Sequence, residues 1–128
     1  MTAPVDWPRR HLRLLSVFAV VLVVAGVAGM LVPPELALMS GALPYDVFHI
    51  AFGVLGIGIV LARAGRAAAV FNLGFGLVDL YQALAGVLGI FPAAVFGLRP
   101  ADHVVHVVIG LVLVTFGVRG LALGRVSA

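Results

Sequence analysis

Two histidines, His49 and His106, occupy matching places in two similar segments, and their side chains could bind haem or a metal ion. His49 follows Asp46 by three residues, and His106 follows Asp102 by four. Imidazole is a suitable ligand for iron, copper and zinc, and a nearby carboxylate can orient the ring. His103 lies three residues before His106, hence on the same helical face. The pattern therefore allows haem b, copper or zinc to bind to these histidines, with both aspartates orienting the rings.

The same residues also fit a purely structural role. Asp46 and Asp102 each lie two residues after a proline at an expected helix start, where a carboxylate can cap the first turn. His49 and His106 are then about one turn inside the membrane, where their rings can reach water or a neighbouring carbonyl. We expect the aspartates to be helix N-caps and the histidines to be structural, with ligand binding as the alternative.

A third group of polar residues lies in the most hydrophobic part of the chain. Asn72, Asp79 and Gln82 fall on or beside one helical face, and Thr115 is the main polar residue in the inner half of the last span. A carboxylate near the middle of a bilayer costs at least about 2.5 kcal/mol and must face the protein interior. Two hypotheses stay open. In the first, Asp79 carries protons or contacts a substrate. In the second, a protonated Asp79 forms a hydrogen bond with a backbone carbonyl or with Thr115 and holds helices together.

The segments that must position these residues are hydrophobic enough to cross a membrane. The 128 residues are 63% hydrophobic and only 10% charged, far below the charge of soluble domains. Without cysteine, disulfides and thiolate metal sites are excluded. The sequence predicts one all-α integral membrane domain, residues 1–128, whose four helical spans cover about 14–32, 47–62, 67–91 and 103–118.

The spans form two consecutive hairpins, because the chain repeats itself. Ala-Gly-Val-Ala-Gly at 25–29 corresponds to Ala-Gly-Val-Leu-Gly at 85–89, and the repeats cover about 14–63 and 67–120. Each repeat contains two spans, so both enter the membrane in the same direction. The sequence therefore predicts parallel repeats related by a pseudo-two-fold axis along the membrane normal.

The arginines predict the orientation. Two loops, one between spans one and two and one between spans three and four, lie on the same side of the membrane and contain only Arg99. The other seven arginines flank the spans on the opposite side: Arg9, Arg10, Arg13, Arg63, Arg66, Arg119 and Arg125. By the positive-inside rule both termini are cytoplasmic. Trp7 and His11, with the first arginines, are expected to anchor the chain at the inner interface. The basic charge thus reflects topology, and no nucleic-acid partner is expected.

Two segments, 46–53 and 99–106, resemble hallmark regions of an uncharacterised bacterial family, domain of unknown function 4383. The resemblance covers residues 14–120 and rests on a histidine followed by small residues early in span two, and on an Ala-Asp-x-x-x-His segment opening span four. At one position where family members tend to carry Asn, this chain has His103. The resemblance implies four spans and a location in the bacterial cytoplasmic membrane. It implies no activity.

The function expected from the sequence is therefore non-enzymatic. No nucleophile, phosphate-loop or metalloprotease motif is present, and small-residue faces favour an accessory or structural subunit that packs with other membrane helices. We expect the lipid bilayer and either copies of this chain or a larger membrane complex as partners. One alternative is a membrane redox protein that binds haem or metal through His49 and His106. A second is a small proton-coupled transporter that uses Asp79.

Overall fold

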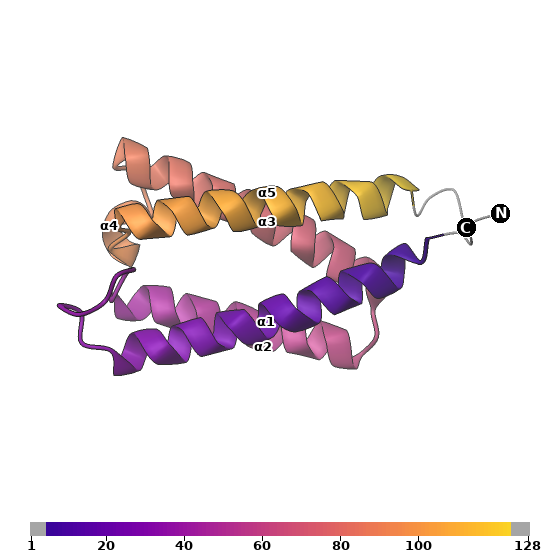
Figure 1. The fold of residues 1–128 in the computed structure, drawn as a ribbon, viewed down its shortest axis with the longest axis horizontal. Helices are drawn as coiled ribbons and strands as arrows, with labels where there is room; N and C mark the ends of the chain where they lie inside the picture. The colour runs from indigo at the N-terminus through magenta and orange to yellow at the C-terminus, as the bar shows by residue number, and fades with distance from the viewer. Residues whose placement is uncertain (1–4, 124–128) are drawn as a thin grey trace.

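The computed structural model describes residues 5–123, and every regular element in that stretch is a helix (Figure 1). In chain order they are α1 (Trp7–Leu31), α2 (Leu43–Leu61), α3 (Gly65–Leu88), α4 (Ala93–Phe96) and α5 (Pro100–Leu123). All except α4 are long and apolar enough to cross a membrane. The prediction of four membrane-spanning helices is confirmed to that extent.

The long helices begin and end at local capping signals, so their bounds differ from those of the apolar spans. α1 begins at Trp7, well before residue 14, because the Asp6 side chain accepts a hydrogen bond of 3.1 Å from the backbone N–H of Arg9. α3 ends at Leu88, before residue 91, because Gly89 takes a left-handed conformation with φ of 67°. The hydropathy of the sequence alone predicts neither the start of α1 nor the end of α3.

The helices pack mainly as two pairs, α1 with α2 and α3 with α5 (Figure 1). The pairs meet chiefly where α1 crosses α3, whereas the backbones of α2 and α5 hardly approach each other. We call the end of the bundle that holds residues 32–42 and 89–99 the α4 end. The start of α1 and the end of α5 lie at the opposite end. The observed pairs match the two hairpins of the sequence repeat, and a two-fold relation between them stays a prediction.

Glycines allow the close approach of the helices within each pair. A Cβ atom added at Gly53 of α2 would lie 2.9 Å from the carbonyl oxygen of Ala19 in α1. One added at Gly110 of α5 would lie 2.9 Å from the carbonyl oxygen of Gly76 in α3. Any larger residue would push the two backbones apart, so these small-residue faces are covered within the chain.

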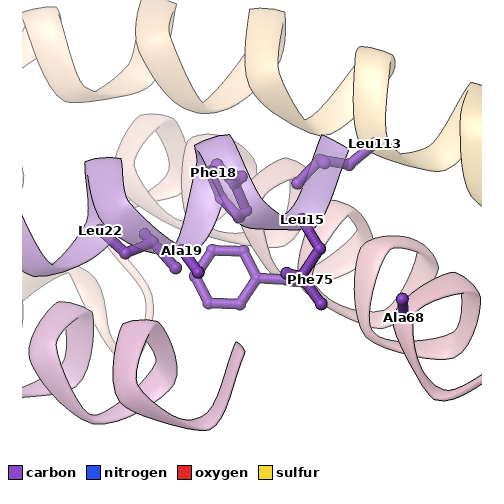
Figure 2. Close-up of a cluster of buried hydrophobic side chains, with 7 residues drawn as sticks. All are labelled: Leu15, Phe18, Ala19, Leu22, Ala68, Phe75 and Leu113. Carbon is purple, nitrogen blue, oxygen red and sulfur yellow. The ribbon is translucent and has the colours of Figure 1, made fainter. Parts of the chain in front are cut away.

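The apolar core lies where the two pairs meet. Its buried members come from α1, α3 and α5, as Figure 2 shows: Leu15, Phe18, Ala19, Leu22, Ala68, Phe75 and Leu113. The rings of Phe18 and Phe75 contact edge to face, with centroids 5.2 Å apart. Large apolar side chains cover the outside as well, such as Val17, Leu77 and Leu111. Such a surface is suited to lipid.

Candidate functional site at the α4 end

The hydroxyl group of Tyr45 links α2 to α5 where the helices themselves are not in close contact. Its oxygen lies 3.0 Å from Oδ1 of Asp102 and 2.9 Å from Nε2 of His106. The hydroxyl has a single proton. If it donates that proton to the carboxylate, Nε2 of His106 must be protonated and donate to the tyrosine oxygen. All three residues are buried, so the bridge forms in a dry environment.

Asp102 is the most heavily bonded side chain of this cluster. Besides the Tyr45 hydroxyl, it accepts hydrogen bonds through Oδ2 from the backbone N–H groups of Ser40, at 2.9 Å, and Arg99, at 2.8 Å. Its side chain is 0% exposed. Asp102 is the third residue of α5 and bonds back to the residue before the helix, as the acidic member of a capping box does. It therefore helps to cap α5 without being the N-cap that the sequence predicts.

The connection between α1 and α2 is hydrogen-bonded to α4 and to the connection between α4 and α5. Ser40 is buried, and its hydroxyl donates to the carbonyl oxygen of Phe96 and accepts from the N–H of Ala42 at 3.2 Å. The Arg99 guanidinium donates to the carbonyl oxygens of Ala37 and of Pro34, the latter at 2.9 Å. These bonds hold the two connections together over the α4 end of the bundle.

The prediction that Asp46 is the N-cap of its helix is also wrong. The N-cap of α2 is Ala42, which makes no side-chain cap hydrogen bond, and Asp46 is the fourth residue of the helix. The Asp46 side chain is buried, yet within residues 5–123 no donor reaches its carboxylate. The reason is that α2 begins one residue before Pro44, which places Asp46 too far into the first turn to cap it.

The three candidate histidines of this end do not form a group of three metal ligands within residues 5–123. Nδ1 of His49 lies 2.8 Å from the carbonyl oxygen of Tyr45, and the two rings contact edge to face. The ring of His103 packs so closely on Gly86 of α3 that a Cβ there would overlap it. In the described part of the chain, no three His, Cys, Asp or Glu side chains are grouped so that they could hold a metal ion. His49 and His106 each form a hydrogen bond through one ring nitrogen, and Nδ1 of His106 has no partner within residues 5–123. Binding of haem or a metal by this pair of histidines stays a prediction.

The polar residues of α3 are buried, and their expected partner is not. Asn72, Asp79 and Gln82 each have less than 4% of their surface exposed, as the sequence predicts for a stripe facing the interior. Thr115 is exposed, because it lies on the face of α5 opposite Leu113 and Gly117. Thr115 is therefore not the partner of Asp79, and a hydrogen bond from a protonated Asp79 to a backbone carbonyl stays a prediction.

At the opposite end of the bundle, Asn72 has a partner that sequence reasoning missed. Nδ2 of Asn72 lies 3.3 Å from Nδ1 of His11 and 3.4 Å from its carbonyl oxygen. His11 is 1% exposed, and its ring packs against Gly120 of α5. The expectation that His11 anchors the chain in the interface is wrong, because α1 begins early enough to carry this residue into the bundle.

Tyr45, Ser40 and Arg99 were missed as members of the polar cluster. One signal was available: the repeat aligns Pro44-Tyr45-Asp46 with Pro100-Ala101-Asp102, so a tyrosine replaces an alanine in an otherwise matching turn. No comparable signal marked Ser40. Its contacts depend on how a loop folds over residues 56 and 62 positions away.

Comparison with known proteins assigns no family to the chain. No family model matches it, and no curated protein or solved structure is significantly similar. The functional argument therefore rests on the geometry above.

Proposed function

We propose that this chain is a non-enzymatic membrane protein that acts as an accessory or structural subunit and associates with copies of itself. The polar groups at the α4 end support this proposal. Asp102, Tyr45 and Arg99 form hydrogen bonds that brace helices and connections. A catalytic group needs a partner to act on and a free face, and this set is directed inward.

The observation that carries self-association is the contrast among the helical glycines. A Cβ at Gly53, Gly76 or Gly110 would meet another helix of the same chain within 3 Å, whereas one at Gly58 or Gly74 would meet nothing within 4 Å. Glycine in a helix interior costs about 1 kcal/mol relative to alanine. At Gly58 and Gly74 no contact within the chain offsets that cost. A second helix that approaches closely is the usual use of such a position in a membrane.

The proposal includes the location and the orientation of the chain. Four apolar helices suit a multi-pass protein, and the arginine distribution favours cytoplasmic termini and an outward-facing α4 end. The resemblance to domain of unknown function 4383 supports the bacterial cytoplasmic membrane.

Leucine substitutions at the two open glycines test self-association. Donor- and acceptor-labelled copies are reconstituted together in vesicles, and energy transfer is measured against dilution with lipid. We expect Gly74→Leu or Gly58→Leu to lower the transfer severalfold, while the helix content measured by circular dichroism stays unchanged because both positions are open within the chain. Val17→Leu, at an exposed position of α1, is the matched control. Transfer as strong in both glycine variants as in the control contradicts association through these faces.

One observation favours a second candidate function, proton-coupled transport through Asp79. Asp79 is 3% exposed in the middle of α3, and no residue between 5 and 123 donates a hydrogen bond to it. An intramembrane carboxylate without a partner is suited to binding and releasing a proton. Proton flux into vesicles loaded with a pH-sensitive dye measures this role. Equal flux through wild type and a folded Asp79→Asn variant rules it out.

A further inference from the structure

A cavity at the α4 end lies apart from the Tyr45 cluster. It has a volume of about 280 Å³ and lies between the end of α1, the following connection and the start of α2. Its walls are more apolar than polar, and Asp46 is the one ionisable side chain among its lining residues. The residues that matter here are Gly29, Met30, Val32, Pro34, Leu43 and Asp46.

The carboxylate of Asp46 is placed in this cavity by a glycine. A Cβ atom at Gly29 would overlap Oδ1 of Asp46, so the carboxylate lies directly against the α1 backbone. The residue is only 3% exposed. No N–H or O–H group of residues 5–123 donates to the Asp46 side chain. The carboxylate therefore faces an open pocket without a protein donor, and a group that enters the pocket can donate to it.

The chemistry of the cavity selects among possible ligands. Calcium and magnesium require about six oxygen ligands, and the cavity lining offers a single carboxylate. An ammonium group carries one charge and up to three N–H donors, which match a lone carboxylate. The apolar walls suit an alkyl chain attached to that ammonium. The cavity lies at the ends of two membrane-length helices, hence at the level of an interface.

We propose that the cavity around Asp46 binds a primary ammonium group, with the Asp46 carboxylate accepting its hydrogen bonds and Met30, Val32 and Leu43 contacting the attached alkyl chain. This chemistry is shared by free alkylamines and by the ethanolamine headgroup of phospholipids. The site is independent of the glycine faces of the proposed self-association, since neither Gly58 nor Gly74 lines it.

The first experiment uses the full chain in nanodiscs of pure phosphatidylcholine, whose headgroup has no N–H donor. Binding of n-butylammonium is measured by calorimetry, with n-butanol as a neutral probe of the same shape. We expect butylammonium to bind about tenfold or more tightly than butanol, because only the cation forms a charged hydrogen bond. Equal binding of the two probes overturns the proposal, and this arm needs no variant that must fold.

Two variants assign the binding to the carboxylate. Asp46→Asn keeps the shape and removes the charge, and it should weaken butylammonium binding about tenfold or more. Glu35→Gln removes an exposed charge from the same connection and should leave binding unchanged. Undiminished binding to Asp46→Asn overturns the assignment, as does an equal loss in the two variants.

The source of the ammonium is tested with native mass spectrometry. Protein from nanodiscs with equal phosphatidylethanolamine and phosphatidylcholine should retain the ethanolamine lipid selectively if the lipid is the ligand, and Asp46→Asn should lose that selectivity. Butylammonium binding without lipid selectivity identifies a free amine as the ligand. If neither binding nor selectivity is observed, Asp46 does not form an ammonium site.

Discussion

The starts of α2 and α5 carry the same Pro-x-Asp turn, yet the two aspartates have opposite surroundings. Asp102 accepts hydrogen bonds from Ser40, Arg99 and Tyr45. Asp46 is as deeply buried and accepts none from the described chain. The first is a structural joint between the two hairpins, and the second is a carboxylate in an apolar cavity.

The difference arises from what lies against each carboxylate. The connection after α1 brings the N–H of Ser40 to Asp102. The Asp46 carboxylate instead lies against the backbone of Gly29 in α1, in the pocket formed with the connection after α1. No residue between 5 and 123 donates a hydrogen bond to it there. The same turn therefore places a hydrogen-bonded carboxylate, Asp102, at the start of α5 and a carboxylate without a protein donor, Asp46, at the start of α2.

Replacing each aspartate with alanine should give the largest difference in stability between the two helix starts. Asp102→Ala leaves the N–H groups of Ser40 and Arg99 without an acceptor, and should destabilise the protein by about 3 kcal/mol. Asp46→Ala removes an unpaired charge and should change stability by less than about 1 kcal/mol. Both changes in stability are measured by adding denaturing detergent to the protein in mixed micelles and following its unfolding by circular dichroism. Equal destabilisation by the two variants would contradict the difference between the two aspartates.

The repeated glycines should behave alike where the aspartates differ. Gly53→Ala and Gly110→Ala each place a Cβ 2.9 Å from a carbonyl oxygen of the facing helix. Both should cost about 2 kcal/mol, because backbone cannot move aside as a flexible side chain can. Val54→Ala, at an exposed position of α2, is the control and should change stability by no more than about 0.5 kcal/mol. The same unfolding titration applies. Tolerance at only one of the two positions would show that the hairpins pack differently.

Substitution of Tyr45, the residue that distinguishes the two turns, should change stability less than the Asp102 and glycine substitutions do. Tyr45→Phe removes one hydroxyl from Asp102, which keeps its two backbone donors, and should cost about 1 kcal/mol. Tyr81→Phe is the matched control, because the Tyr81 hydroxyl bonds the Phe91 carbonyl at 2.6 Å on an exposed side chain. Nitrogen-15 spectra of His106 should shift only in Tyr45→Phe. An unchanged His106 signal there would remove Tyr45 from the bridge.

Several features of the fold were predictable from the sequence because they depend on local or one-dimensional patterns. Four apolar segments predicted four long helices, and the burial of Asn72, Asp79 and Gln82 followed from the cost of polar groups in lipid. The helix ends were less predictable. Asp6 extends α1 outside the apolar span, and the left-handed Gly89 shortens α3 within it.

The pairing of polar side chains could not be predicted in the same way. Asp79 and Thr115 are both polar and at plausible depths, yet Thr115 is turned outward. His11 was placed in the interface and in fact meets Asn72, 61 positions away. A shift of one residue turns a side chain by about 100° around the helix, so small errors in register change every partner.

The sequence by itself determined that this chain forms hydrophobic helices with polar residues directed inward. In lipid the backbone must satisfy its own hydrogen bonds, and only helices allow this for such segments. The tertiary structure alone decided that Asp102 joins the hairpins while Asp46 stays unpaired. That outcome depends on which loop lies over which helix end, and a hydrogen bond forms only when both partners are brought within about 3 Å.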